Sequence, residues 1–318
     1  MRGTAPGLRR EVAHPPVPLR FLGATLLLLA AHGSARAQDD GARLYMMVPD
    51  DTTIASLRLH RLHSNLAVDP GATAGSALDT NLAVFQFVQA LDLGGRQSFI
   101  FLVVPASRIS AGDGRGDSET IHGLGDVQLG FVYGLHGAPA LPTAEYARHR
   151  PGLAVNALAK IFFPTGAYSS GRSINVGANR WALRLGAPVV YAIGKGMADP
   201  GLVTIELMPT VTFFGANDDP FGSDRSRQKP LFIFEGHLTR GLGRRLWASL
   251  DILWREGGEF EVDGADAGNP QRALSLGGTA TFALGSSASL RFSAGGVVAR
   301  NEHGPNGWIL RTIVGVAF

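Results

Sequence analysis

A base and a hydroxyl that could do chemistry together stand two residues apart in the segment His237-Leu238-Thr239. In an extended strand that spacing places both side chains on one face, where a histidine could activate a hydroxyl for hydrolysis. Threonine is a poorer nucleophile here than serine would be, and the sequence assigns no third group that orients the histidine. Lipid hydrolysis is therefore only a minor hypothesis, and we expect no catalytic residues and no enzymatic activity.

Charged and titratable side chains recur on the polar faces of the expected strands. If those faces turn inward, the side chains either line a narrow lumen and select solutes, or form paired ions that fill a closed interior. Both interpretations stay open, and the second is favoured because buried charges must be paired in any case. The candidates for lining the lumen are Lys160, Arg184, Glu206, Glu235, His237, Asp251 and Arg255.

Acidic clusters in the expected loops could bind a divalent cation. They are Asn217-Asp218-Asp219 and the nearby residues Asp263 and Asp266. Asp and Asn are also the ordinary residues of turns, and the spacing of a calcium-binding loop is absent. The chain has no cysteine, which excludes disulfides and thiolate metal sites. We therefore expect neither a metal site nor a cofactor.

The formal charge of +3 does not indicate a nucleic-acid partner, because its excess is confined to the N-terminus. Residues 1–37 carry five arginines against one glutamate, a net charge of +4, so the remainder of the chain is at −1. A nearly neutral chain gives little support to a basic binding surface.

Residues 1–37 have the three parts of a secretory signal peptide. An arginine-bearing start is followed by an apolar run over 21–31 and by the small-x-small site Ala35-Arg36-Ala37. The apolar run is about 11 residues long, short of the roughly 20 that span a bilayer. We expect export with cleavage after Ala37, and one further domain over 38–318.

From residue 41 onward the chain alternates short strand-like runs with clusters of Gly, Pro, Asn, Asp and Ser, and no convincing helical period appears. An exported chain without a helical anchor is either a soluble periplasmic protein or a closed barrel. About 12 runs are expected, an even number as in single-chain bacterial barrels. They cover residues 53–61, 82–91, 98–104, 126–135, 152–162, 181–191, 203–214, 231–240, 246–255, 273–283, 290–300 and 307–318.

The faces of the runs and the lengths of their links favour a transmembrane antiparallel up-and-down β-barrel. In 181–191 one face carries Trp181, Leu183 and Leu185 and ends on Tyr191, while Arg184 lies on the other face. Long polar links alternate with short ones, as the outer loops and periplasmic turns of such barrels do. The link 136–151 is an exception, and the sequence does not show whether 38–52 plugs the barrel or begins its first strand. A water-soluble β-sandwich has the same alternation and remains the alternative fold.

The final run resembles the C-terminal signal that guides assembly of bacterial outer-membrane barrels. By that resemblance it would be read by the barrel-assembly machinery and would close the barrel against the first strand. The residues that carry the signal are Trp308, Leu310, Val314, Val316 and Phe318.

Several segments resemble the outer-membrane family named for the meta-cleavage pathway of phenol degradation. Members of that family are described as outer-membrane transporters or channels, often encoded beside genes for degrading aromatic compounds. The resemblance implies passive uptake of small hydrophobic or aromatic solutes by a protein surrounded by outer-membrane lipid and lipopolysaccharide. A non-transporting structural or adhesion barrel is the alternative. The segments are GLGDVQLG at 123–130, FPTGAY at 163–168, INVGANRW at 174–181, FGANDD at 214–219, LWASLD at 246–251 and REGG at 255–258.

Overall fold

The structure is a computed structural model that describes residues 40–65, 78–112 and 118–318. The expected signal peptide and its cleavage site lie outside the described residues. Within the described part of the chain, no helix is both long and apolar enough to cross a bilayer.

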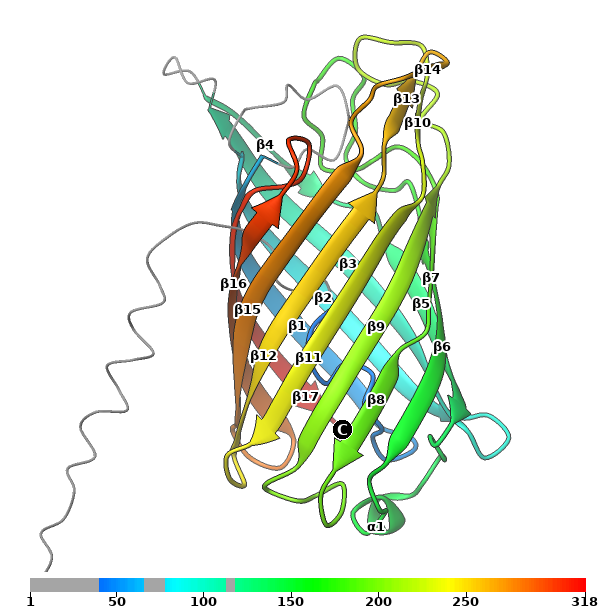
Figure 1. Ribbon diagram of the computed structural model, residues 1–318, viewed down its shortest axis with the longest axis vertical. Coiled ribbons are helices and arrows are strands. Elements are labelled where there is room, and N and C mark those ends of the chain that lie inside the picture. The colour runs from blue at the N-terminus through cyan, green and yellow to red at the C-terminus, as the bar shows by residue number, and fades with distance from the viewer. Residues whose placement is uncertain (1–39, 66–77, 113–117) are drawn as a thin grey trace, which may run out of the picture. The chain divides into compact units, whose positions relative to one another are not determined.

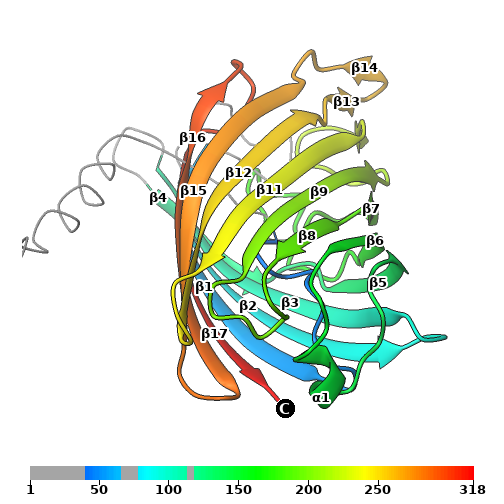
Figure 2. The ribbon, with the colours of Figure 1, turned by 60° about the horizontal axis from the view of Figure 1, so that its bottom comes forward.

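The chain forms one closed, 12-stranded antiparallel barrel (Figures 1 and 2). The ring closes because β11 pairs with β9 and β17 pairs with β1, from Ile54 opposite Ala317 to Ser64 opposite Gly307. Two of the 12 barrel strands are interrupted. One consists of β4 and β5, and the other consists of β7 and β8, which lie on either side of Ala187 and Pro188. The wall strands are β1 (Thr53–Ser64), β2 (Leu78–Asp92), β3 (Gln97–Gly112), β4 (Ser118–Leu124), β5 (Gln128–His136), β6 (Leu153–Phe162), β7 (Ala182–Gly186), β8 (Val189–Ile193), β9 (Val203–Phe214), β11 (Leu231–Gly241), β12 (Leu246–Gly257), β15 (Gln271–Ala283), β16 (Ala288–Arg300) and β17 (Gly307–Ala317).

The predicted barrel and its strand number are confirmed, and the predicted loop over 105–125 is wrong. Strand β3 continues to Gly112 and pairs with β4, so this hairpin extends the wall where a loop was expected. Three short strands in the long links also form a small separate sheet: β10 (Ser226–Gln228), β13 (Phe260–Val262) and β14 (Ala265–Asp266).

The two faces of each strand have opposite polarity, as strand β9 illustrates. Ile205 and Leu207 point outward and are 43% and 41% exposed, whereas Thr204, Glu206 and Thr210 point inward and are buried. Apolar side chains on the outside of a closed barrel are stable only where lipid surrounds the wall. This arrangement defines a membrane-spanning barrel and rules out the sandwich, in which the apolar faces would meet in a core.

Residues 40–52 lie inside the barrel and are not part of its first strand (Figure 2). The side chain of Tyr45 packs against Phe99, Leu158 and Met208, which come from the inner face of the wall. The sequence left open whether this segment plugs the lumen or begins the first strand. The structure places residues 40–52 in the lumen, toward the end of the barrel where the short turns lie.

The unusually long link between β5 and β6 packs against this inner segment. It contains the single-turn helix α1 (Thr143–Tyr146), and the hydroxyl of Tyr146 donates to the carbonyl oxygen of Met47 at 3.0 Å. The amide of Asp50 donates to the carbonyl oxygen of Leu141 at 2.8 Å. The link is therefore long because it covers the mouth of the barrel and holds the inner segment.

Replacing an outward leucine tests which face contacts lipid. The variant Leu207→Arg should lower the free energy of unfolding by about 2–4 kcal/mol, because it places a charge against hydrocarbon. The measurement is denaturant unfolding in lipid vesicles. The matched control, Leu242→Arg in the short turn after β11, should change it by less than about 0.5 kcal/mol. Equal effects of the two variants would contradict the orientation of the wall.

Candidate functional site: the barrel lumen

Two wall carboxylates hold the backbone of the inner segment. Glu235 of β11 accepts hydrogen bonds from the amides of Asp40 and Gly41, at 3.0 and 2.9 Å. Glu206 of β9 accepts one from the amide of Arg43 at 2.7 Å. Both carboxylates are almost completely buried, and hydrogen bonds to buried charged groups are among the stronger ones in proteins. The segment is thus fastened at its tip by polar contacts.

His237 lies between two carboxylates and does not activate a hydroxyl. Its Nε2 lies 3.1 Å from Glu235 Oε1 and its Nδ1 lies 2.6 Å from Asp251 Oδ1. Thr239 Oγ1 instead accepts from Arg43 Nε at 2.9 Å and shares a hydrogen bond with Thr204. Because both ring nitrogens are engaged by carboxylates, the arrangement does not form the nucleophile and base pair that the sequence spacing suggested.

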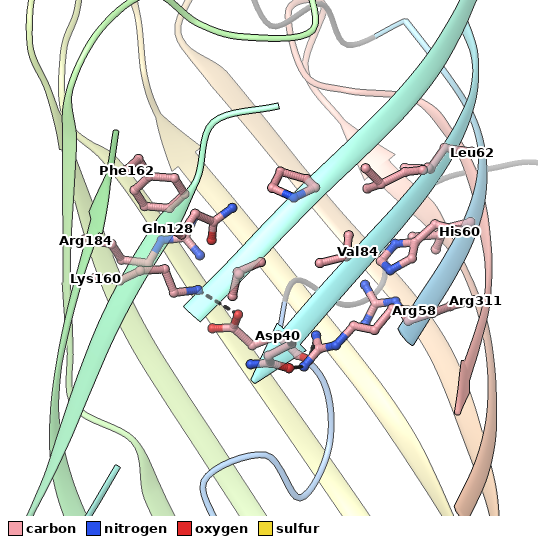
Figure 3. A pocket seen from close by; sticks show the side chains of 15 residues that line it. Asp40, Arg58, His60, Leu62, Val84, Gln128, Lys160, Phe162, Arg184 and Arg311 are labelled. Carbon is pink, nitrogen blue, oxygen red and sulfur yellow. Dashed lines mark hydrogen bonds and ion pairs between the residues drawn. The ribbon is translucent and has the colours of Figure 1, made fainter. Parts of the chain in front are cut away.

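A cavity of about 180 Å³ lies directly above the tip of the inner segment (Figure 3). Asp40 lies between cationic side chains, with Lys160 Nζ 2.9 Å from Asp40 Oδ1 on one side. On the other side Arg58 Nη1 donates to the carbonyl oxygen of Asp40 at 3.3 Å, and Arg311 lines the same wall. The floor of the cavity is therefore polar and mostly basic.

A second cavity, of about 370 Å³, continues toward the long links. It shares Gln128, Phe162 and Arg184 with the first cavity, so the two form one outer space. Apolar side chains line much of it, and Arg180 and Arg255 contribute charge.

A third cavity lies on the opposite side of the inner segment, at the end of the barrel with the short turns. Its volume is about 640 Å³ and its lining includes the turn after β11. The guanidinium groups of Arg43 and Arg291 lie 4.6 and 4.9 Å from the ring centre of Trp247. The lumen thus has space on both sides of the inner segment.

The structure places all seven predicted side chains inside the barrel, but in two different surroundings. Lys160, Arg184 and Arg255 line the outer cavities, whereas the four acidic and histidine residues form the hydrogen-bonded group around the inner segment. Sequence reasoning missed Arg58, Arg180, Arg291 and Arg311. The signal for Arg58 was present, because it occupies an inward position between the outward residues Leu57 and Leu59, and Arg311 likewise follows the outward Leu310.

Four of the segments that carry the family resemblance meet at one place in the wall. The strand is interrupted between β4 and β5. There the carboxylate of Asp126 accepts hydrogen bonds from the backbone amides of Gly166 and Ala178, each at 2.9 Å. A Cβ on Gly166 would lie 2.6 Å from the Cα of Gly177, so glycine lets these two backbones touch. The fourth segment joins through Asn217, whose side-chain Nδ2 donates a hydrogen bond to the Tyr168 hydroxyl at 2.9 Å. We call this junction the Asp126 latch.

The acidic residues considered as cation ligands form ion pairs and hydrogen bonds within the long links. Asp218 pairs with Arg225 at 2.8 Å, and Asp263 accepts the amides of Asp224 and Arg225. Hydrogen bonds from Lys229 to Asp266 and Glu259 raise the pKa of the Lys229 ammonium group. Within the described ranges, no group of three or more His, Asp or Glu side chains is arranged to hold a metal ion.

The fold and lumen define this chain as a membrane-spanning β-barrel of the outer-membrane type, with its interior partly filled by its own N-terminal segment. It belongs to the family described as "Putative MetA-pathway of phenol degradation", whose model matches residues 63–310. None of the curated proteins compared with the chain matches it.

Among the solved structures that match this chain, the first described here shares its fold. The COG4313 outer membrane channel from Pseudomonas putida F1 is 20% identical, with a TM-score of 0.72, covering 88% of this chain and 100% of that one. The beta domain of the Bordetella autotransporter BrkA is 10% identical, with a TM-score of 0.48, covering 84% and 99%.

Removing the carboxylate of the Asp126 latch should loosen the long link that follows β6. In Asp126→Ala the amides of Gly166 and Ala178 lose their acceptor, at a cost of about 1–3 kcal/mol for each group left unsatisfied. Hydrogen exchange at these two amides should accelerate by about tenfold or more. Asp224→Ala, in an exposed position, is the control and should leave both amides as slow as in the unchanged protein. Unaltered protection in Asp126→Ala would contradict the latch.

Neutralising the carboxylate that holds the tip of the inner segment should make the lumen more permeable to ions. Glu235→Gln keeps the size of the side chain but replaces charge-assisted hydrogen bonds with weaker neutral ones. Single-channel recordings in planar bilayers should show a larger mean conductance than the unchanged protein. Glu259→Gln, in an outer link, serves as the control. A conductance that stays the same in Glu235→Gln would show that this contact does not hold the segment in place.

Proposed function

We propose that the protein is an outer-membrane channel for passive uptake of small hydrophobic or aromatic compounds. The observation that carries the proposal is the pair of lumen spaces on either side of the inner segment, which is held in the lumen by hydrogen bonds to the wall and by apolar packing. A structure built only to be rigid would have no need of cavities at both ends. The long links face the outside of the cell and the short turns face the periplasm.

The size of the barrel limits the solute. Barrels of about 8 strands are filled by side chains, and those of 16–18 strands leave a broad aqueous pore. A barrel of 12 strands therefore leaves a narrow pore. The apolar lining of the outer space suits a hydrophobic or aromatic body, and the family description, which refers to phenol degradation, supports the same class of solute. The related Pseudomonas protein is itself called a channel.

The remaining parts of the proposal follow from the same architecture. The proposed role is transport without catalysis, as the name of the related Pseudomonas channel suggests. Its partners are outer-membrane lipid and lipopolysaccharide around the wall and the assembly machinery that reads β17. In that strand Leu310, Val314 and Val316 face outward and are at least 39% exposed, in positions where a second protein can read them.

A non-transporting barrel is the second candidate, and one observation favours it. The inner segment packs against the wall from several sides and occupies part of the lumen, as it would in a barrel that serves only as a surface structure. Flux measurements separate the two candidates.

The test is the flux of phenyl glucoside, a neutral aromatic solute that crosses lipid slowly, into liposomes containing the purified protein. The channel predicts uptake that rises with the amount of protein and rises further in Glu235→Gln. Uptake equal to that of protein-free liposomes in both forms, with the barrel shown to be folded, would refute the channel and support the non-transporting barrel.

A further inference from the structure

Two arginines on the outer face of the wall have no carboxylate partner within the described part of the chain. Arg61 of β1 and Arg108 of β3 are both exposed, and none of the ion pairs between described residues includes either of them. By contrast, Nη2 of the outward Arg272 of β15 lies 2.6 Å from Glu256 Oε1. The guanidinium groups of Arg61 and Arg108 are therefore available to a group outside the protein.

The strand register places these two arginines in one row across four neighbouring strands. Arg61 is opposite Asn81 of β2, and Asn81 is opposite Arg108. Arg108 in turn is opposite His122 of β4. Neighbouring strands lie about 4.8 Å apart, so the two arginines stand roughly 10 Å from each other. All four side chains are exposed, and we call them the arginine row.

The arginine row lies where the outer face of these strands changes from apolar to polar. Toward the short turns the next row holds Leu59 and Leu124, which are 51% and 57% exposed. Toward the long links the next row holds His63 and Asp79, with His63 Nδ1 3.1 Å from Asp79 Oδ1. The hairpin of β3 and β4 lies at the long-link end of the barrel (Figure 1). The arginine row is thus at the level of the lipid headgroups of the outer leaflet.

A recess of about 740 Å³ in the outer wall adjoins the arginine row. Ala83 and Ala106, opposite each other on β2 and β3, line it, whereas the next outward pair toward the short turns is Phe85 and Val104. Because the two alanines are small, an acyl chain can lie close to the backbone there and gain dispersion contacts. The side chains that border the recess are Leu59, Leu124 and Leu310 on its apolar side and Arg61, Asn81 and His122 on its polar side.

Other strands carry aromatic side chains at outward positions near the long links. Trp181, which precedes β7, is exposed, and the ring of Trp254 of β12 lies edge-on to Phe232, 5.7 Å between centres. Aromatic rings are the common residues at the interfaces of barrels, because they suit the boundary between hydrocarbon and water. The arginine row departs from this pattern, so general anchoring in lipid does not account for it.

We propose that the outer faces of β1–β4 form a binding site for a phosphorylated glycolipid of the outer leaflet, the lipid A part of lipopolysaccharide. Arg61 and Arg108 bind its phosphates, because their planar, forked donors match phosphate oxygens. Asn81 and His122 form hydrogen bonds with sugar hydroxyls, and the recess receives one acyl chain. A glycolipid with two separated phosphates uses both arginines at once, whereas a phospholipid with one phosphate reaches only one of them. The site specifies a partner named in the proposed function and does not depend on solute transport.

The test measures binding of purified lipid A to the whole protein in detergent micelles, by native mass spectrometry of the complex. The unchanged protein should bind one lipid A saturably, and removal of both phosphates from the lipid should weaken binding by about tenfold or more. Phosphatidylglycerol, which has a single phosphate, should also bind more weakly than lipid A.

Variants on the outer face locate the site. Arg61→Gln and Arg108→Gln should each weaken lipid A binding by about threefold to tenfold, and the double variant by about tenfold to a hundredfold. Arg240→Gln is the matched control: it removes an exposed, outward arginine at the short-turn end of β11 and should leave binding unchanged. Ala106→Phe fills the recess but keeps both arginines, and should weaken binding by about threefold. An apolar side chain suits the lipid-facing wall, so this variant keeps the barrel folded if an arginine variant does not fold.

The outcomes separate this inference from the channel itself. Lipid A binding that is as tight in the double variant as in the unchanged protein would overturn the site. Equal binding of phosphatidylglycerol and lipid A would overturn the assignment to a glycolipid and show a general interface for anionic lipids. Unchanged binding in Ala106→Phe would remove the recess from the site. None of these results affects the channel, which is refuted by the absence of phenyl glucoside flux whether or not lipid A binds.

Discussion

Backbone hydrogen bonding in a medium without water is the constraint on which this structure depends. Lipid offers no partner for an exposed amide or carbonyl group, so a sheet that crosses a membrane must have no free edge. Here the pairing of β17 with β1 closes the ring over 11 opposed residue pairs. Once the ring is closed, each strand has one face for lipid and one for the interior, and polar side chains can only point inward.

An interior lined with polar groups then needs partners of its own, and the inner segment supplies many of them. Its backbone amides meet Glu206 and Glu235, and its Arg43 meets Thr239. A layer of carboxylates thus contacts residues 40–43 of the segment. Cavities lined in part by cationic side chains lie on the long-link side and on the short-turn side of this layer. The same residues that satisfy buried polar groups also divide the lumen into compartments, which is why structural and functional interpretations of these charges overlap.

The sequence was sufficient for most of the wall because the wall is periodic, although it missed the hairpin that β3 and β4 form. Alternation within a strand such as 203–214 identifies both faces, and the alternating lengths of the links indicate which ends face outside. The inner segment has no period, and its contacts lie far along the chain: Gly41 meets Glu235, 194 residues away. The Asp126 latch likewise depends on amides 40 and 52 residues away. Side chains that act through such distant partners leave no local pattern, so only the structure could bring them together.

The central claim is that solutes travel through the lumen past the inner segment, and covalent modification of one lining position tests it most directly. The chain has no cysteine, so Arg184→Cys carries the only thiol. A negatively charged, water-soluble thiol reagent added from the long-link side during single-channel recording should reduce the current in one step. Confirmed modification that leaves the current unchanged would contradict the account, because the path would then lie elsewhere.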